Sequence, residues 1–453
     1  MISVSGVRGT VGGRVGDNLT PVDAVAFAAA YGTLLAEAPV RRVVLGRDAR
    51  PSGAALAALV ANTLVFMGFE VIDLGLTTTP TLSMYVPQAE AAGGVMLTAS
   101  HNPVEWNALK CFAPDGAFIS PEMGEQLKTI YLQNDFSFSS VQDLGRIVLD
   151  ERALAYHIDQ ILNMPWVDVQ AIRAARFRIG LDPVNSSGAI AVPALLERLG
   201  VEAVLTVHAE PTGWFAHNPE PLPEHLTDLS KLVVQNNLDL GISVDPDVDR
   251  LALVCETGEP FGEEYTLVAV ADYWLSRQPG PVVSNLSSSR ALDDVAAKYG
   301  QRRYTSAVGE AHVVARMRAE GALMGGEGNG GIIVGPLHDG RDALVGIALV
   351  LSHLARSGLS CSALRASLPN YYLVKQRLEL DGPFDALAWE ARLLDAFPGA
   401  EIDRTDGLRV ALPDSWLHIR PSNTEPIARL YAEASTREAA EALCNRLMKQ
   451  AAF

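Results

Sequence analysis

The chain has 453 residues, more than one ordinary hydrophobic core accommodates, so three or four domains are expected. Its hydrophobic fraction of 48% and charged fraction of 20% are typical of a folded globular protein and exclude a disordered one. The formal net charge of −17 excludes nucleic acid or an anionic membrane as the main partner, because both bind basic surfaces.

The start of the chain and its cysteines indicate a cytoplasmic protein. No basic segment followed by an apolar one opens the chain, so no secretory signal is expected. The most apolar stretches are interrupted by polar residues before they reach membrane length. The 4 cysteines form no CxxC pair, and we expect them to be reduced thiols.

A unit of strand, polar turn, helix, glycine and strand is predicted three times in chain order. The first copy comprises 43–45, 46–50, 56–68 and 70–74. The second comprises 177–181, 182–188, 190–200 and 201–207, and the third comprises 282–283, 285–289, 292–300 and 303–305. Such units build mostly parallel sheets, so we expect three related α/β domains.

The end of the chain has a different pattern. Strands are expected at 416–419 and 428–432 on either side of a polar loop, and an amphipathic helix at 436–448. The predicted fold class is α/β, with three related α/β domains of mixed, mostly parallel sheets and a C-terminal α+β domain around a central cleft. The expected domains are 1–144, 145–254, 255–368 and 369–453.

A polar segment after an apolar run is the first candidate site. The segment TASHNP at 98–103 follows the run 94–97, and its Pro103 disfavours helix, so we expect a tight exposed loop at a strand end. Open α/β sheets bind ligands at such strand ends. Taken alone, the segment also fits an ordinary turn.

The segment DPDVDR at 245–250 is a candidate metal loop between the strand-like stretches 240–244 and 251–254. Alternate positions point to one side, where Asp245, Asp247 and Asp249 offer oxygen ligands to Mg²⁺. An EF-hand is disfavoured, because Arg250 stands at the position of its glycine and the flanks are strand-like. A phosphatase with an Asp nucleophile and a solvated acidic turn stay open as alternatives.

Two further segments are candidate binding loops. GGEGNGG at 325–331 permits close approach of a ligand, and its Glu327 and Asn329 can hydrogen-bond sugar hydroxyls. RPSNTEP at 420–426 places Arg420 beside hydroxyls and an amide in a turn that suits a phosphate dianion. Each of the two also fits an ordinary turn when it is taken alone.

Together, the order and spacing of these segments resemble the alpha-D-phosphohexomutase superfamily over essentially the whole chain. The resemblance implies an intramolecular phosphotransferase, classed as an isomerase, that moves a phosphoryl group between the C1 and C6 oxygens of a hexose. It implies a phosphoserine at Ser100 and a hexose 1,6-bisphosphate as intermediate and activator. It also implies Mg²⁺ held by the Ser100 phosphate, Asp245, Asp247 and Asp249.

The same resemblance assigns expected roles to further residues. Residues expected near the transferring phosphate are Arg8 in the segment SGVRGT at 5–10, Lys110 and Arg250. The sugar loop would use Glu327 and Asn329, and the phosphate loop would use Arg420, Ser422, Asn423 and Thr424. Lys110 and His101 are both candidates for the general base, and His101 also fits a structural role.

Departures from the common family pattern bear on the substrate. Many relatives have DGDGDR and GExSGH where this chain has DPDVDR and GEGNGG, so Gly331 replaces the usual histidine. Together with EWNALK at 105–110, this variant most resembles the archaeal-type phosphoglucosamine mutases and their bacterial relatives. It implies interconversion of glucosamine 6-phosphate and glucosamine 1-phosphate, with phosphomannomutase/phosphoglucomutase activity as the alternative.

The competing functions are a sugar-phosphate-binding protein without catalysis and a phosphatase that uses the same metal site. Intact Ser100, Arg420 and the three aspartates disfavour the first, since a protein without activity has no need of them. The expected partner is a small sugar phosphate, with no nucleic acid and no membrane, and the chain is expected to be a monomer or a homodimer.

Overall fold

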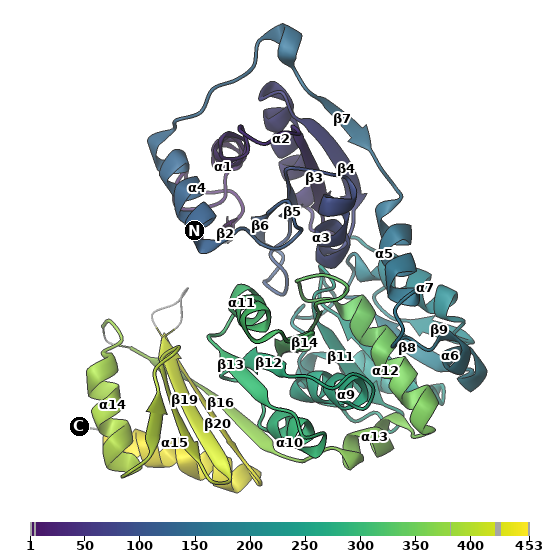
Figure 1. Ribbon diagram of the computed structural model, residues 1–453, viewed down its shortest axis with the longest axis vertical. Coiled ribbons are helices and arrows are strands. Elements are labelled where there is room, and N and C mark those ends of the chain that lie inside the picture. The colour runs from purple at the N-terminus through teal and green to yellow at the C-terminus, as the bar shows by residue number, and fades with distance from the viewer. Residues whose placement is uncertain (1, 4–5, 381, 422–426, 452–453) are drawn as a thin grey trace. The chain divides into compact units, whose positions relative to one another are not determined.

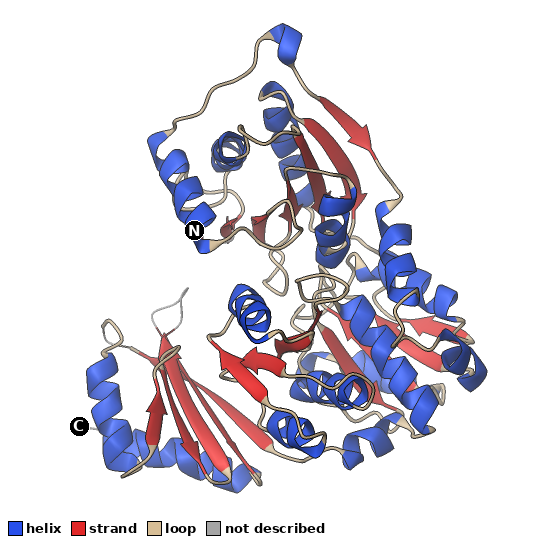
Figure 2. Ribbon diagram, viewed as in Figure 1, coloured by secondary structure: helices blue, strands red, loops and turns tan. Residues whose placement is uncertain are grey.

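The computed structural model describes residues 2–3, 6–380, 382–421 and 427–451, in which helices and strands alternate along most of the chain (Figures 1 and 2). It contains two compact units. The first unit comprises Met1–Thr266 and Gly330–Leu364, and the second comprises Leu267–Asn329 and Arg365–Phe453.

A seven-stranded mixed sheet occupies the first part of the first unit. Its strands are β1 (Ile2–Ser3), β2 (Gly6–Thr10), β3 (Arg42–Arg47), β4 (Glu70–Leu76), β5 (Gly93–Leu97), β6 (Trp106–Phe112) and β7 (Arg146–Leu149), in the order β1-β2-β6-β5-β3-β4-β7. β3 pairs in parallel with β4 and β5, whereas β6 runs antiparallel to β5 and β2. The accompanying helices are α1 (Pro21–Leu34), α2 (Gly53–Phe66), α3 (Thr79–Gln88), α4 (Pro121–Gln133) and η1 (Val141–Asp143).

The local sequence explains where these helices begin and end. Thr20 precedes α1 and forms a capping box with Asp23, in which each side chain accepts a hydrogen bond from the other residue's backbone N–H. After α2, Gly68 adopts φ +83, a left-handed conformation that lets the chain turn into β4. The first predicted unit of strand, helix and strand is thereby confirmed as β3, α2 and β4.

A second mixed sheet follows in the first unit. Its strands are β8 (Arg178–Asp182), β9 (Ala203–Thr206), β10 (Leu240–Val244) and β11 (Leu251–Cys255), in the order β11-β10-β8-β9. β8 pairs in parallel with β9 and β10, and β11 runs antiparallel to β10. The helices are α5 (Ala153–Leu162), α6 (Val169–Ala175), α7 (Gly188–Leu199), η2 (Pro223–His225) and α8 (Thr227–Gln235). The second predicted unit is confirmed, and α7 ends at Gly200 with φ +80.

The second unit contains parallel strands and an antiparallel sheet. The parallel strands are β12 (Val282–Asn285), β13 (Arg303–Ser306) and β14 (Met324–Glu327), with β12 between the other two. The antiparallel sheet has the order β16 (Tyr372–Glu379), β20 (Ile427–Ala434), β19 (Ser415–Pro421), β18 (Leu408–Leu412) and β17 (Glu401–Asp403). The helices are α10 (Ala291–Lys298), α11 (Glu310–Glu320), α14 (Ala386–Ala396) and α15 (Arg437–Ala451). The predicted C-terminal strands and helix are confirmed as β19, β20 and α15.

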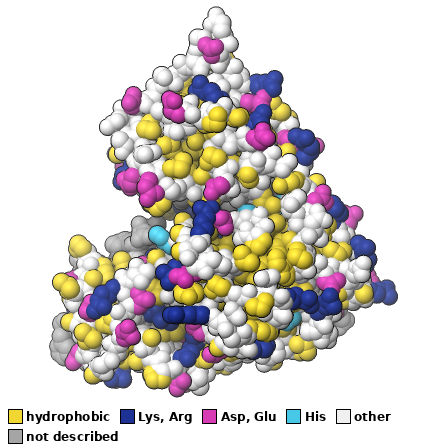
Figure 3. All heavy atoms as spheres, in the orientation of Figure 1, with side chains coloured by type: hydrophobic (Ala, Val, Ile, Leu, Met, Phe, Trp, Pro, Cys, Tyr) yellow, Lys and Arg dark blue, Asp and Glu magenta, His cyan; other side chains and the backbone are white. Residues whose placement is uncertain are grey.

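The remaining elements are α9 (Glu263–Leu275), β15 (Gly331–Val334), α12 (Ala343–Ser357) and α13 (Cys361–Ser367). Among the described residues, no single helix has the length and apolar composition of a membrane span, whereas α12 and α13 meet that test only as a pair bent by 88°. Most side chains of α12 are buried, as expected for the apolar stretch within it. On the face seen in Figure 3, acidic and basic side chains are interspersed.

Arg50 holds together, through hydrogen bonds, the segment that follows β5. It has a relative exposure of 1% and uses all of its N–H donors. Its Nε donates to Asp48 Oδ2 at 3.0 Å. Its two terminal nitrogens donate at 2.5–2.9 Å to the carbonyls of Ser100, Asn102, Pro103 and Trp106. A buried guanidinium with every donor used fixes the backbone around it.

Replacing Arg50 with Met should lower the free energy of unfolding of the first unit by about 3–5 kcal/mol, because Asp48 would be left buried without its charge partner. Urea unfolding followed by circular dichroism measures this change. The control Arg146→Met removes a guanidinium that is 75% exposed and should cost less than about 1 kcal/mol. Equal losses in the two variants would contradict the role of Arg50 as a cross-link.

Candidate active site

Ser100 lies in a tight loop directly after β5, at the strand end predicted from the sequence. The loop is not exposed at this residue, however, because the relative exposure of Ser100 is 2%. Its Oγ donates to Asp245 Oδ2 at 2.6 Å, across 145 residues of chain. The expectation of an exposed loop was therefore wrong at Ser100, since the loop after β10 packs against the hydroxyl.

The backbone of Ser100 has φ +50, a left-handed conformation that is strained in a residue other than glycine. Thr98 holds it by accepting a hydrogen bond from the Ser100 N–H at 2.9 Å, and Arg50 holds it through the Ser100 carbonyl. Strain maintained by several fixed contacts is typical of a residue whose side chain must point in one direction.

Asp245, Asp247 and Asp249 form a buried acidic cluster between β10 and β11. All three have 0% exposure, and one carboxylate oxygen from each lies within 4.8 Å of the others. They converge because the segment turns at Val248, which has φ +63, and not because a strand alternates its side chains. Asp247 Oδ1 and Asp249 Oδ1 are buried without a hydrogen-bond partner among the described residues. Such oxygens suit a hard divalent cation.

The three carboxylates have different affinities for protons. Burial, together with the charges of Asp249 and Asp247, raises the pKa of Asp245 well above its ordinary value. Burial also opposes ionisation of Asp249, but the charges of nearby Arg and Lys side chains outweigh it and hold the pKa of Asp249 below its ordinary value. The cluster therefore combines a carboxyl group that retains its proton readily with one that stays ionised.

Basic side chains compensate the acidic cluster. Lys110 Nζ lies 2.7 Å from Asp247 Oδ2 and 3.9 Å from Asp249 Oδ2. Arg250 Nε lies 3.9 Å from Asp249 Oδ1, and its Nη1 lies 3.3 Å from Glu220 Oε1. The structure thus places Lys110 beside Asp247 and Asp249, and Arg250 beside Asp249.

Arg8 contacts the loop that follows β5, and His101 belongs to this loop. Arg8 Nη1 donates to Asn102 Oδ1 at 2.9 Å. His101 Nδ1 lies 3.4 Å from Ser100 Oγ. Burial and the positive charges of Arg250 and Arg8 lower the pKa of His101 well below its ordinary value, so its imidazole is neutral at neutral pH and available to accept a proton.

The sequence patterns did not identify three further side chains: two that contact the acidic cluster, and one that contacts its neighbour Arg250. Arg341 Nη2 donates to Asp249 Oδ2, and Thr79 Oγ1 donates to Asp247 Oδ2 at 2.6 Å. Glu220 pairs with Arg250 and lies 4.0 Å from His101. Arg341 and Thr79 are separated from their partners by 92 and 168 residues, so no local pattern could reveal them.

In the second unit, Glu327 ends β14 and has a relative exposure of 3%. Its Oε1 accepts hydrogen bonds from Asn285 Nδ2 at 2.8 Å and from the Gly309 N–H at 2.9 Å, which fix the carboxylate in place. Asn329 lies in the turn that follows β14. The glycine at 325 is explained by packing: a Cβ there would lie 2.7 Å from the Val283 carbonyl oxygen.

Arg420 lies near the end of β19 in the same unit, and its Nε is 3.0 Å from Asp406 Oδ2. Asp406 Oδ2 also accepts a hydrogen bond from the Val308 N–H at 3.0 Å. The other expected phosphate-loop residues, Ser422, Asn423 and Thr424, lie outside the described residues.

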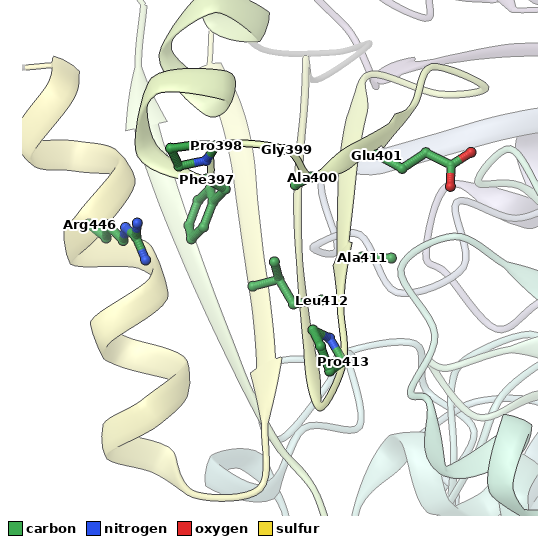
Figure 4. A pocket seen from close by; sticks show the side chains of 9 residues that line it. All are labelled: Phe397, Pro398, Gly399, Ala400, Glu401, Ala411, Leu412, Pro413 and Arg446. Carbon is green, nitrogen blue, oxygen red and sulfur yellow. The ribbon is translucent and has the colours of Figure 1, made fainter.

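A shallow hollow of about 330 Å³ lies elsewhere in the second unit (Figure 4). It is lined by Phe397, Pro398, Gly399, Ala400, Glu401, Ala411, Leu412, Pro413 and Arg446. No candidate site residue belongs to this hollow, so it takes no part in the site.

Four sequence families match consecutive parts of the chain. They are described as phosphoglucomutase/phosphomannomutase alpha/beta/alpha domain I (residues 2–138), domain II (155–258), domain III (262–372) and the C-terminal domain (377–450). The order of the families along the chain agrees with the order of the predicted α/β units.

The chain is also similar to whole proteins. It is 37% identical to a probable phosphoglucosamine mutase of Methanopyrus kandleri, over 97% of this chain and 95% of that protein. It is 34% identical to a phosphoglucomutase/phosphomannomutase of Thermococcus kodakarensis, over 96% and 94%. A crystal structure of a Burkholderia thailandensis phosphoglucomutase/phosphomannomutase family protein superposes with a TM-score of 0.85 at 25% identity, covering 99% of this chain and 97% of the other. The chain therefore belongs to the phosphoglucomutase/phosphomannomutase family of alpha-D-phosphohexomutases, which are isomerases that transfer a phosphoryl group.

Proposed function

We propose that this phosphohexomutase interconverts glucosamine 6-phosphate and glucosamine 1-phosphate, with Ser100 as the residue that carries the transferred phosphoryl group. The observation that carries the proposal is the strained, fixed position of Ser100, with its Oγ 2.6 Å from Asp245 in the buried acidic cluster. No other described serine has its hydroxyl hydrogen-bonded to one of these aspartates.

The acidic cluster fits Mg²⁺, because its donors are carboxylate oxygens and two of them are buried without a hydrogen-bond partner among the described residues. Asp245, Asp247, Asp249 and the phosphate on Ser100 would hold the ion. When bound, Mg²⁺ supplies positive charge that polarises the phosphoryl group on the serine.

The basic residues around Ser100 offset the negative charge that a phosphoserine would bring to the acidic cluster. A phosphoserine carries about 1.5–2 negative charges at neutral pH, and the acidic cluster adds further negative charge nearby. Lys110 and Arg250 lie within 3.9 Å of the aspartate oxygens, and Arg341 donates to Asp249. Arg8 is held beside the loop by Asn102. These cations lower the energy of the charge that spreads over the phosphoryl oxygens during transfer.

His101 is the better candidate for the general base. Its imidazole is neutral because its pKa is lowered, whereas the Lys110 ammonium is engaged with Asp247 at 2.7 Å. In the transfer to the sugar, the bond between phosphorus and Ser100 Oγ breaks and a bond to the sugar hydroxyl oxygen forms. The hydroxyl proton passes to His101 Nδ1, which lies 3.4 Å from Ser100 Oγ, and from there to the serine oxygen.

The product of this first transfer is a hexose 1,6-bisphosphate. The bisphosphate must reverse its orientation before its other phosphate returns a phosphoryl group to Ser100. We assign Glu327 and Asn329 to recognition of the sugar in both orientations. Arg420, together with Ser422, Asn423 and Thr424, would hold the phosphate that is not transferred, since a guanidinium can bind a phosphate through two hydrogen bonds.

Glucosamine is the proposed sugar because of the charge at its C2 substituent. The 2-amino group is largely an ammonium ion at neutral pH, and a carboxylate such as Glu327 favours it over a hydroxyl, by about 1.5–3 kcal/mol for a charge-assisted hydrogen bond. The Methanopyrus relative, named a probable phosphoglucosamine mutase, supports this choice. The Thermococcus relative supports the second candidate, combined phosphoglucomutase and phosphomannomutase activity.

Replacing Ser100 with Ala should abolish isomer formation, by at least about a thousandfold, because no oxygen remains to carry the phosphoryl group. The fold should persist at a cost of about 1 kcal/mol for one lost hydrogen bond. A coupled assay that measures isomer and free phosphate separates mutase from phosphatase activity. The control Ser83→Ala removes a buried hydroxyl that donates to Gly116 O, and it should keep its turnover. Near-normal turnover in Ser100→Ala would refute the mechanism.

Replacing Asp247 with Asn should weaken Mg²⁺ binding and lower kcat together, because the cation loses a charged oxygen ligand. Titration of activity against Mg²⁺ gives both quantities. The control Asp143→Asn alters an exposed carboxylate and should leave the Mg²⁺ dependence unchanged. An unaltered Mg²⁺ dependence in Asp247→Asn would locate the metal elsewhere.

The substrate is decided by kcat/KM for the 1-phosphates of glucosamine, glucose and mannose, measured with one activating bisphosphate. Glucosamine 1-phosphate should exceed the others by about ten- to a hundredfold, which corresponds to the free energy of the charge-assisted hydrogen bond. In Glu327→Gln, kcat/KM for glucosamine 1-phosphate should fall more than kcat/KM for glucose 1-phosphate, so the preference for glucosamine should shrink. A tenfold preference for glucose or mannose would refute the glucosamine assignment and leave the mutase assignment intact.

A further inference from the structure

A second cluster of potential metal ligands lies in the first unit, among residues that the proposed reaction does not use. Asp182 is the last residue of β8, and His208 follows β9, the neighbouring strand of the sheet (Figure 1). His217 lies in the irregular segment between β9 and η2. One ligand atom from each of the three residues lies within 4.8 Å of the others.

The two imidazoles meet at a single carboxylate oxygen. His217 Nε2 lies 2.9 Å from Asp182 Oδ2, and His208 Nδ1 lies 3.1 Å from the same atom. The other oxygen of this carboxylate, Oδ1, accepts a hydrogen bond from the Val184 N–H at 3.0 Å. The orientation of the carboxylate is therefore fixed, with Oδ2 directed at both histidines.

The hydrogen bonds of His217 require a cation at this place. His217 Nδ1 lies 2.8 Å from the Asn218 carbonyl oxygen, which can only accept, so Nδ1 must carry a hydrogen. In a neutral imidazole the other nitrogen, Nε2, then has a lone pair, and that lone pair would point at the lone pairs of Asp182 Oδ2. The contact is favourable only if a proton or a metal ion lies between the two atoms.

A proton satisfies this contact in the absence of metal. Burial lowers the pKa of His217, but its hydrogen bond to Asp182 and the charge of Asp182 outweigh burial and leave the pKa raised above its ordinary value. A metal ion would compete with that proton. The arrangement in which one ring nitrogen donates to a carbonyl while the other faces the ion is the usual one for a histidine ligand.

We propose that Asp182 Oδ2, His208 Nδ1 and His217 Nε2 form a binding site for a divalent transition-metal ion of the Zn²⁺ class, separate from the acidic cluster. Ligand atoms around a tetrahedral Zn²⁺ lie about 3.3 Å apart, so the observed 2.9 and 3.1 Å need only small side-chain shifts. The His208 and His217 side chains are 19% and 16% exposed, which leaves access for the ion and for a water as the fourth ligand.

The donor set distinguishes this site from the acidic cluster. Two imidazoles and one carboxylate suit Zn²⁺, Co²⁺ or Ni²⁺, whereas the oxygen-only donors of Asp245, Asp247 and Asp249 suit Mg²⁺. Asp228 Oδ2 lies 3.6 Å from His208 Nε2, where a carboxylate commonly orients a ligating histidine.

The proposed ion would link the end of β8, through Asp182, to the segment between β9 and η2, which contains His208, His217 and Glu220. The backbone of this segment already contacts the turn after β8, since the Gly213 N–H donates to the Asn185 carbonyl at 2.9 Å. The Ala216 N–H donates to Asn185 Oδ1 at 3.0 Å. Glu220 in turn pairs with Arg250, so the ion would stabilise a segment adjoining the acidic cluster without contacting the substrate.

The test uses untagged, full-length protein freed of metal with a chelator that is then removed. Co²⁺ is titrated at pH 7.5, and its visible absorption reports tetrahedral coordination by nitrogen and oxygen ligands. We expect about one equivalent of tetrahedral Co²⁺ in the unmodified protein, displaced by Zn²⁺ and accompanied by a rise in melting temperature. Excess Mg²⁺ should leave the band in place, because Mg²⁺ binds imidazole poorly.

Three variants locate the site. Asp247→Asn should keep the band, since it alters only the acidic cluster. His225→Gln removes a histidine whose Nδ1 bonds the Glu220 carbonyl, in the same part of the chain but outside the cluster, and it should also keep the band. The double substitution His208→Gln with His217→Gln should lose the band or weaken Co²⁺ binding by at least about tenfold.

The proposal is overturned if the unmodified protein gives no tetrahedral band or if Mg²⁺ removes the band. It is also overturned if the double variant binds Co²⁺ as tightly as the parent. The Mg²⁺ competition needs no variant, so the test remains decisive even if the double substitution prevents folding.

Discussion

Three buried carboxylates, those of Asp245, Asp247 and Asp249, lie within 4.8 Å of one another, and basic side chains from separate parts of the first unit compensate their charge. Burying even one unpaired charge is costly, so such a cluster persists only if nearby cations balance it. Lys110 from β6 and Arg341 from the turn before α12 reach it from distant parts of the chain. The same cluster accepts a hydrogen bond from the Ser100 hydroxyl and leaves carboxylate oxygens for a cation. One electrostatic constraint therefore links the proposed phosphoserine, the proposed metal site and the basic residues.

The backbone is strained at Ser100 and at Val248, on the two loops that meet at the acidic cluster. Both residues have positive φ without being glycine, and each such conformation costs about 1–3 kcal/mol. At Ser100, Arg50 offsets the free-energy cost of the positive φ by donating hydrogen bonds to four carbonyls of the loop after β5. The Ser100 hydroxyl is therefore held in one position, and in the proposed reaction this avoids an entropic cost.

The two units contain different groups of candidate site residues. The first unit contains the charged groups proposed for phosphoryl transfer, and the second contains Glu327 and Arg420, each held by hydrogen bonds or an ion pair within its own unit. The family assignment accounts for both. The Asp182, His208 and His217 cluster belongs to neither kind, which is why we interpret it as a structural metal site next to the reaction machinery.

The sequence by itself determined the repeated α/β units, because apolar runs, polar turns and terminal glycines such as Gly68 and Gly200 act locally. It also singled out Ser100 and the three aspartates as candidate site residues, since each lies in a distinctive segment after a strand. Only the tertiary structure decided that Ser100 is buried, that the aspartates meet through a turn at Val248, and that Arg341, Thr79 and Arg50 support them. These contacts join residues that are far apart in the chain, and their free energy arises from burial and charge pairing that exist only after the segments have packed together.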